Sequence, residues 1–180
     1  MAPFGAADPR LLIVGLAPGL HGANATGRPF TGDHAGILLY RTLHEFGLAS
    51  RPESQSANDG LVLRDCRITN AVKCVPPGNK PLPEEIRNCN AYLAAELASL
   101  RAGCVLLALG AIAHDAVLAA LGLRRPPYRF AHGAEHALPV RLRMIDSYHC
   151  SRYNTQTRRL TPEMFREVVG RAAALARARH

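Results

Sequence analysis

The sequence is poor in long apolar runs and in targeting signals, and each shortage excludes a class of protein. No apolar run approaches the roughly 18 residues that a membrane-spanning helix requires, so a bilayer protein is not expected. The first ten residues, MAPFGAADPR, lack the basic start, apolar stretch and cleavage site of an export signal, which favours the cytoplasm. Repeats and low-complexity linkers are also missing, so residues 1–180 are expected to form a single domain.

Lysine and acidic residues are scarce. Only Lys73 and Lys80 are lysines, yet the formal net charge is +8, because 22 Lys and Arg outnumber 14 Asp and Glu. This balance favours a polyanionic partner. Codon usage in an Arg-biased genome is an equally good explanation of the ratio of Arg to Lys, but it does not explain the small number of acidic residues.

The phosphate-binding motifs of the common nucleotide-binding folds are also missing. No lysine precedes residue 73, so a G-x-x-x-x-G-K-[ST] loop is excluded, and no G-x-G-x-x-G opens a helix. The first apolar run instead leads into GLAPGLHGANATGRPFTGD, residues 15–33, which contains five glycines. Such a segment allows the backbone to approach a ligand closely. It predicts a pocket without a nucleotide signature.

Short apolar runs typical of buried strands alternate with segments in which apolar residues recur at helical spacing. The predicted strands are residues 11–18, 66–72, 104–110 and 140–149. The predicted helices are residues 35–48, 83–101, 111–123 and a last helix with Thr161 as N-cap and Pro162 in its first position. This alternation indicates an α/β fold, a three-layer sandwich in which helices flank a central four-stranded parallel sheet.

The loops that follow the strands of a parallel sheet meet at its carboxyl edge, where ligands bind. Residues 15–33, 69–80 and 147–158 are therefore expected to surround one crevice. Residues 50–60 and 124–138 read as surface loops.

Three segments in this order carry a family resemblance. They are GLAPGLHGANATGRPFTGD, TNAVKCVPPGNKPLPEEIRNC and SYHCSRYNTQTRRLTPEMF. Together they resemble the uracil-DNA glycosylase superfamily, and within it family five, the UDGb type, over residues 11 to about 165. The resemblance implies a monomer that removes uracil and other deaminated or damaged bases from DNA.

Cleavage of the bond between sugar and base puts positive charge on the sugar and negative charge on the departing base. Asp33 is expected to stabilise the sugar and to orient or deprotonate water, since Leu16, Ala17 and Pro18 offer nothing polar. Asp33 also fits as an N-cap of the helix that follows, and the two roles are compatible. His149 is expected to donate a hydrogen bond to the leaving base, with a structural histidine as the alternative.

The base pocket is expected to consist of Gly15, Ala17, Phe30 and Asn70. Phe30 stands in a polar loop, where a ring that stacks on an extruded base is one explanation and a loop anchor is the other. Asn70 carries both a donor and an acceptor, as the edge of a pyrimidine requires, and is grouped with the catalytic residues; its alternative is a turn residue.

The basic, hydroxyl-rich stretch SRYNTQTRR suits contacts with DNA. In the superfamily this loop enters the minor groove, so Arg152 or Tyr153 is expected to fill the vacated stack. The predicted DNA-binding residues are Ser151, Arg152, Tyr153, Asn154 and Arg158. A solvated charged loop is the alternative. Cys150 departs from the Pro or Val that is usual in the family.

The five cysteines are odd in number and scattered, so disulfides are not expected. Cys74 and Cys89 resemble the second half of the four-cysteine iron-sulfur site of family five, whose first half precedes the first strand. The ten residues before Leu11 contain no cysteine, so either the chain is shortened or a 4Fe-4S cluster has been lost. No cofactor is expected to be required for the chemistry.

The sequence thus predicts a monofunctional glycosylase that hydrolyses the N-glycosidic bond of uracil in DNA during base excision repair. Hypoxanthine and hydroxymethyluracil are expected as further substrates, because the family has a permissive pocket. Two alternatives remain open. One is a catalytically weak or inactive DNA-binding relative, and the other is a hydrolase of free nucleotides.

Overall fold

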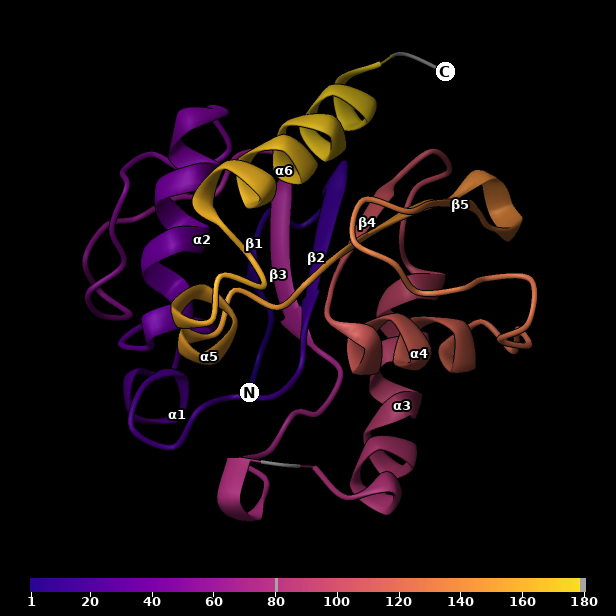
Figure 1. The fold of residues 1–180 in the computed structure, drawn as a ribbon, viewed down its shortest axis with the longest axis horizontal. Helices are drawn as coiled ribbons and strands as arrows, with labels where there is room; N and C mark the ends of the chain where they lie inside the picture. The colour runs from indigo at the N-terminus through magenta and orange to yellow at the C-terminus, as the bar shows by residue number, and fades with distance from the viewer. Residues whose placement is uncertain (80, 179–180) are drawn as a thin grey trace.

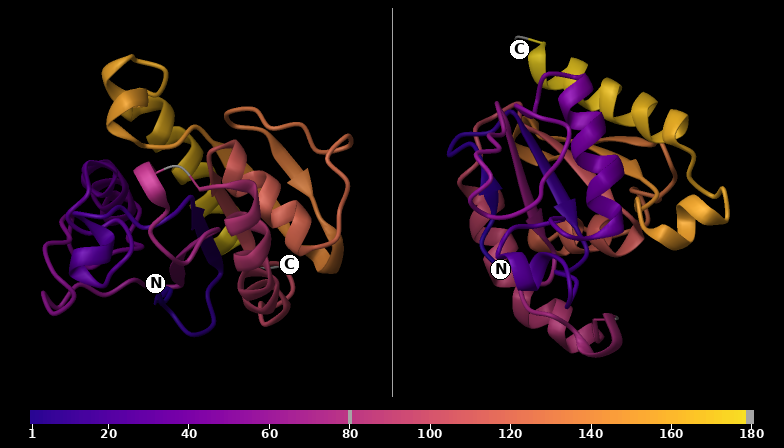
Figure 2. Two further views of the ribbon diagram at one scale, coloured as in Figure 1. Left: turned by 90° about the horizontal axis from the view of Figure 1, so that it is seen from below. Right: turned by 90° about the vertical axis from the view of Figure 1, so that its left-hand side faces the viewer.

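The fold is built on one mixed sheet with helices on both faces (Figures 1 and 2). The structure is a computed structural model that describes residues 1–79 and 81–178. The sheet has six strands in the order β1-β3-β2-β4-β6-β5. This arrangement confirms the predicted class, an α/β sandwich of three layers.

Four parallel strands form the centre of the sheet, as the sequence predicts. They are β2 (Leu11–Gly15), β3 (Cys66–Asn70), β4 (Val105–Leu109) and β6 (Arg143–Ser147). Every residue of β2 and β4 is buried, which explains why these strands read as continuous apolar runs rather than as alternating ones. All four run in one direction, so their carboxyl ends meet at one edge of the sheet.

Two short antiparallel strands complete the edges, and the sequence did not predict them. The strand β1 (Phe4–Gly5) pairs with β3, and β5 (Glu135–Ala137) pairs with β6. Residues 124–138 are therefore only partly a surface loop. Strands of two and three residues carry too little periodicity to be recognised in a sequence.

Helices cover the two faces in pairs. On one face lie α2 (His34–Glu45) and α6 (Pro162–Arg177), and on the other lie α3 (Pro83–Ala98) and α4 (Ala111–Ala120). Thr161 caps α6 as predicted, since its hydroxyl oxygen accepts a hydrogen bond from the Met164 N–H at 3.2 Å. The helical pattern of the sequence continues from Pro162 to residue 179, and that last position lies outside the described residues.

Each face of the sheet has its own apolar core. Leu11 and Ile13 of β2 pack with α2 and α6, whereas Leu12 and Val14 pack with α3 and α4. Alternation of side chains along the strand produces this division. Within the described residues, no helix is long and apolar enough to cross a membrane.

Short helical segments occupy the loops at the carboxyl edge. They are α1 (Ala23–Thr26), the 3₁₀ turn η1 (Pro77–Asn79) and α5 (Arg152–Gln156), while a second 3₁₀ turn, η2 (Pro139–Arg141), precedes β6. In Figure 1, α1 and α5 lie near one another on the side of α2. Loops that the sequence places far apart are thereby collected at one end of the sheet.

Candidate active site

A cavity of about 480 Å³ opens at the carboxyl edge of the sheet. The three loops that the sequence assigned to one crevice all contribute to its wall, the first through residues 16–21, Phe30 and residues 33–35, the second through Pro76, and the third through His149, Ser151 and Arg152. Position 80, at the end of the second loop, lies outside the described residues. Asp33 and His149 line this same cavity, so the structure brings together the two residues on which the sequence hypothesis depends.

Asp33 occupies the N-cap position of α2, but its side chain does not cap the helix. Its Oδ2 atom instead accepts a hydrogen bond from the Ala23 N–H at 3.2 Å. The carboxylate is therefore turned away from the helix end and towards the glycine-rich loop. Asp33 therefore has the backbone position of an N-cap, but its side chain does not act as the cap and lines the cavity instead.

The glycines of the first loop make room for this carboxylate. A Cβ atom at Gly22 would lie 1.8 Å from Asp33 Oδ1, and one at Gly19 would lie 2.6 Å from the same atom. Real Cβ atoms do not approach other atoms so closely, and glycine is the residue that permits the contact. The Gly-rich loop is thus fitted around an acid.

The surroundings of Asp33 affect its ionisation. Burial raises the pKa of Asp33 above its ordinary value of 3.8, and the hydrogen bond from Ala23 opposes this effect. Because burial makes its charged form less well solvated, this carboxylate is a better base than a fully exposed one.

Phe30 is held in a strained conformation beside the cavity. Its φ of 57° lies in the left-handed region, which a bulky residue rarely adopts, and its side chain is buried. Gly36 accommodates this conformation, because a Cβ atom there would lie 1.7 Å from the Phe30 carbonyl oxygen. Strain of this kind is typical of functional sites, where it fixes a side chain before a ligand arrives.

The Phe30 ring and the His149 imidazole lie nearly parallel. Their centroids are 6.0 Å apart and the planes are inclined by 27°. Burial lowers the pKa of His149 to about 4. The imidazole is therefore neutral at pH 7, and a neutral ring donates one N–H without carrying positive charge.

Asn70 is buried at the end of β3, and neither its Oδ1 nor its Nδ2 atom has a hydrogen-bond partner among the described residues. It does not line the cavity wall directly. Its amide lies against Gly15, where a Cβ atom would be 2.4 Å from Asn70 Oδ1 and 2.7 Å from the Phe30 ring. Buried amides are nearly always paired, so this one calls for a ligand or water.

The residues predicted to form the base pocket therefore differ in position. Ala17 and Phe30 line the cavity, together with the apolar Leu16 and Pro18, whereas Gly15 and Asn70 are not part of its wall and lie next to the Phe30 ring.

The residues predicted to bind DNA lie on and after α5. Arg152, Tyr153 and Arg158 are exposed, and Tyr153 has 71% of its surface accessible. Ser151 and Asn154 instead have internal partners. The Ser151 hydroxyl accepts from the Asn154 N–H at 3.4 Å, and Asn154 Nδ2 donates to the His149 carbonyl oxygen at 2.8 Å. These two residues stabilise the turn that carries His149.

Sequence reasoning missed how the first loop is fixed. Arg28, 4% exposed, pairs with Asp59 at 2.8 Å and donates to the Ala57 carbonyl oxygen at 2.7 Å. Residues 50–60, which the sequence predicts to be a surface loop, therefore anchor the glycine-rich loop. A lone arginine and a lone aspartate 31 positions apart leave no signal in the sequence.

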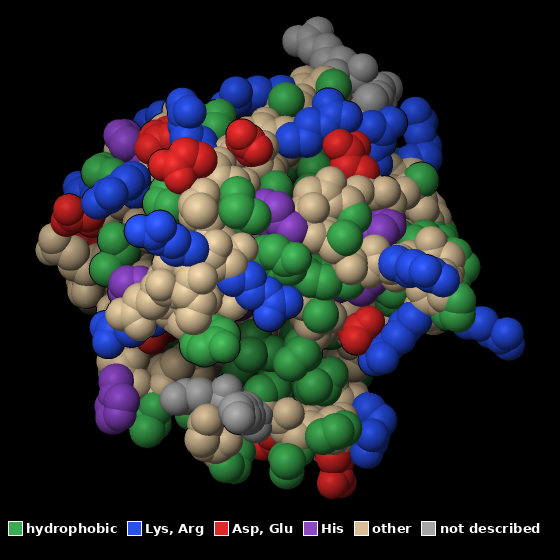
Figure 3. Space-filling model, viewed as in Figure 1, with side chains coloured by type: hydrophobic (Ala, Val, Ile, Leu, Met, Phe, Trp, Pro, Cys, Tyr) green, Lys and Arg blue, Asp and Glu red, His purple; other side chains and the backbone are tan. Residues whose placement is uncertain are grey.

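A second cavity of about 610 Å³ adjoins the first and shares Phe30, Asp33, His34 and Arg152 with it. Its wall also includes Arg41. Figure 3 shows Lys and Arg side chains spread over much of the face that it draws. The rim of the site therefore offers basic groups on which a polyanion can rest.

The cysteines do not supply an iron-sulfur site among the described residues. The Cys89 sulfur accepts from the Lys73 N–H at 3.4 Å, next to Cys74, but in the described part of the chain no third His, Cys, Asp or Glu joins this pair. Burial raises the pKa of the Cys104 thiol to about 11 and that of Cys150 to about 12, and it also raises that of Cys66. Two available thiols do not meet the requirement for four thiolates.

Comparison with known proteins identifies the family. The family model described as the uracil DNA glycosylase superfamily matches residues 2–173. A relative from Thermus thermophilus named type-5 uracil-DNA glycosylase is 52% identical, over 96% of this chain and 78% of its own. Relatives of the same name from Pyrobaculum aerophilum and Mycobacterium leprae are 44% and 46% identical, over 96% of this chain and 74% and 76% of theirs. The chain therefore belongs to the uracil DNA glycosylase superfamily, in its type-5 branch.

Proposed function

We propose that this protein is a monofunctional DNA glycosylase that removes uracil from DNA by hydrolysis of the N-glycosidic bond, as the first step of base excision repair. One observation carries the proposal. A single cavity is lined by a carboxylate, an aromatic ring and a neutral imidazole, and next to the ring lies a buried amide, Asn70, that has no hydrogen-bond partner among the described residues. The names of the type-5 relatives support the choice of uracil.

Recognition begins with extrusion of the base, because its glycosidic bond is inaccessible within the duplex. The extruded ring stacks on Phe30, whose strained backbone holds the aromatic face in place before DNA binds. The amide of Asn70 offers one acceptor and two donors to the edge of the base. Uracil presents an N–H between two carbonyl groups and complements such an amide.

The chemistry requires opposite charges at two points. As the bond from C1′ to the base breaks, its electron pair leaves with the base and the sugar becomes an oxocarbenium ion. The Asp33 carboxylate stabilises the sugar, orients a water molecule and accepts its proton as the oxygen adds to C1′. His149 donates its N–H to a carbonyl oxygen of the leaving base. The base leaves as an anion and takes up a proton, and Asp33 gives the proton of the water back to solvent, so the products are the free base and an abasic site.

The positive rim holds the DNA. Arg152, at the start of α5, lines the cavity, and the next residue, Tyr153, is largely exposed. We assign to these two side chains the place in the stack that the extruded base vacates. Arg158 contacts phosphate. Ser151 and Asn154 act by holding the turn, in addition to any contact with the DNA backbone.

The wider proposal is that the chain works as a single-domain monomer in the cytoplasm and needs no cofactor for catalysis. The pocket also accepts hypoxanthine and hydroxymethyluracil, since its wall of Leu16, Ala17 and Pro18 is apolar and discriminates weakly between bases.

The test is a single-turnover assay on oligonucleotides that contain uracil, hypoxanthine or hydroxymethyluracil, followed by alkaline cleavage of abasic sites. Release of uracil without strand cleavage before the alkali supports a monofunctional enzyme. Binding of DNA without release of any base would contradict the proposal and favour the inactive relative. Activity on free nucleotides alone would favour the nucleotide hydrolase.

A further inference from the structure

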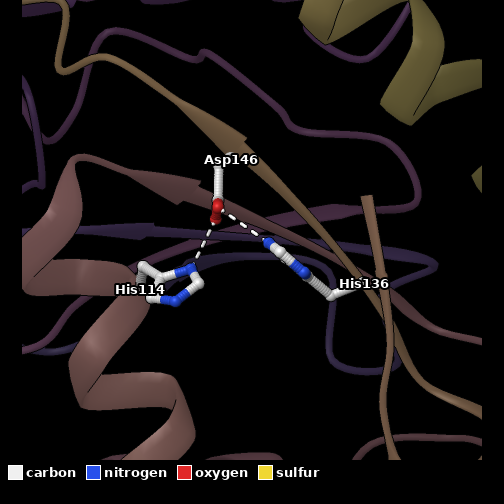
Figure 4. Close-up of side chains that lie close together, drawn as sticks. All are labelled: His114, His136 and Asp146. Carbon is white, nitrogen blue, oxygen red and sulfur yellow. Dashed lines mark hydrogen bonds and ion pairs between the residues drawn. The ribbon is translucent and has the colours of Figure 1, made fainter. Parts of the chain in front are cut away.

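A second cluster of polar side chains lies outside the cavity, on α4, β5 and β6. His114 of α4, His136 of β5 and Asp146 of β6 point towards one another, as Figure 4 shows. His114 Nδ1 is 2.8 Å from Asp146 Oδ1, and His136 Nε2 is 2.9 Å from Asp146 Oδ2. None of the three lines the cavity that contains Asp33 and His149.

The cluster is deeply buried. The side chains of Asp146 and His114 are 0% and 1% exposed, and that of His136 is 10% exposed. The aromatic rings of Tyr128 and Phe130 meet the two imidazoles edge-on. A carboxylate in such a place is costly unless positive charge or strong hydrogen bonds compensate it.

The orientation of His114 resembles that of a metal ligand. Its Nε2 atom is 3.0 Å from the Tyr128 carbonyl oxygen, which fixes the ring and leaves Nδ1 aimed at the cluster. Metal-binding histidines almost always donate their second N–H to a carbonyl or carboxylate oxygen in this way. His136 approaches from the opposite side, on an edge strand with partial access to solvent.

We propose that His114, His136 and Asp146 form a binding site for one divalent transition-metal ion, of which zinc fits best. Two imidazole nitrogens and one carboxylate oxygen are a ligand set that zinc accepts, with water in the fourth position. The three ligand atoms lie within 4.8 Å of one another. In a tetrahedral zinc site such atoms are about 3.4 Å apart, given bonds of about 2.0–2.2 Å.

Binding replaces protons that the cluster holds without the metal. His114 faces an acceptor with each nitrogen, so both carry a proton, and the metal takes the place of the Nδ1 proton, which is released to solvent. His136 binds through Nε2, and a proton held at that atom passes to Nδ1 or to solvent. Asp146 binds through a carboxylate oxygen. No bond within the side chains is broken and no oxidant is required.

The ion would join three elements that already meet through apolar packing and hydrogen bonds. It connects α4 to the short strand β5 and to β6, whose continuation carries His149 three residues after Asp146. The site is thus structural, because its position away from the cavity gives it no contact with a base. It would hold the end of β6 and stabilise residues 124–138.

The test uses the whole chain, freed of metal with a chelator and then titrated with zinc against a chromophoric competitor. One zinc per chain and a rise in melting temperature with zinc are expected. Cobalt in place of zinc should give the strong visible bands of a tetrahedral ion, without the near-ultraviolet charge-transfer band of thiolate ligands.

Two histidine variants make the test specific. His136→Gln should lose this zinc, and its circular dichroism without metal should match that of the natural chain, because β5 lies at the edge of the sheet. His44→Gln is the matched control, since His44 Nδ1 contacts the Ala49 carbonyl oxygen far from the cluster. His44→Gln should retain one zinc.

Three results would overturn the proposal. They are the absence of zinc binding by the natural chain, equal binding by His136→Gln, and loss of binding in a Cys74→Ser, Cys89→Ser double variant. The last would place the ion at the cysteine pair. All three are independent of base excision, so failure of the zinc proposal and failure of the proposed function are distinguishable.

Discussion

The cavity at the carboxyl edge and the His114–His136–Asp146 cluster are both polar and partly buried, but their polar atoms differ. In the cluster, each Asp146 oxygen and both His114 nitrogens have partners at 2.8–3.0 Å. In the cavity, the Asn70 amide has no partner among the described residues, and Phe30 is strained. Partners within the protein hold the polar atoms of the cluster in place, whereas the Asn70 amide beside the cavity is left for a ligand or water.

The largest expected effect is that of Asp33→Asn. Removal of the charge with little change of shape should lower the single-turnover rate on uracil by about 10³-fold, within the range of about 10²–10⁴ for a general acid or base. DNA affinity, measured by fluorescence anisotropy, and the free energy of unfolding should change little. A large loss of DNA affinity would instead indicate that Asp33 is a structural residue, and the cavity would then not differ from the His–Asp cluster in this respect.

In the His114–His136–Asp146 cluster, Asp146→Ala should lower the free energy of unfolding. It leaves two buried imidazoles without their acceptor, and loss of one member of a buried pair costs about 3–5 kcal/mol. Urea unfolding of the metal-free protein would measure this difference. A cost below that of an ordinary surface substitution would show that the cluster does not support the fold.

Gly22→Ala tests whether the first loop is shaped around Asp33. The new Cβ atom would lie 1.8 Å from Asp33 Oδ1 and must displace the carboxylate, so a rate loss of about 10²-fold is expected for a shift of about 1 Å. Gly19→Ala, with its Cβ 2.6 Å from the same atom, is the graded control and should lose less. Equal rates for the two variants would contradict the steric argument.

The pH profile distinguishes a neutral His149 from a charged one. Because the pKa of His149 is lowered to about 4, its protonation state does not change between pH 6 and pH 8, and the rate should be flat there. The rate should fall towards lower pH, since Asp33, whose pKa is raised by burial, loses its charge there. A loss of rate above about pH 6.5 would indicate an imidazolium acid. His149→Gln, which retains an N–H donor, should keep more activity than His149→Ala.

The smallest effect is expected at the rim. Arg158→Ala should leave the chemical rate unchanged and reduce the slope of log affinity against log salt by about 1, as loss of one phosphate contact does. Arg41→Ala, from the adjoining cavity, is the comparison that tests how far the DNA path extends. An unchanged salt slope in Arg158→Ala would remove this residue from the DNA contacts.

Some of these features were visible in the sequence. The apolar runs around Ile13 and Leu107 predicted the parallel strands, because a strand buried on both faces must be continuously apolar. The order of strands and loops predicted that residues 15–33 and 147–158 meet, and the cavity confirms it. The roles of Asp33, His149 and Asn70 in catalysis remain predictions.

Other features were outside the reach of sequence patterns. Several contacts join residues that carry no periodic signal in the sequence. They are the Arg28–Asp59 pair, the hydrogen bond from Asn154 to the His149 carbonyl oxygen, and the contacts within the His–Asp cluster. The edge strands β1 and β5 were missed for the same reason. Such contacts depend on how distant segments pack.

The sequence by itself determined the class of fold and the family, because hydrophobic periodicity and local motifs are properties of neighbouring residues. Only the tertiary structure decided that Asp33 turns from its helix towards the cavity, that Asn70 is buried without a partner among the described residues, and that burial lowers the pKa of His149. Burial and hydrogen bonding set these properties, and both depend on residues that are distant along the chain.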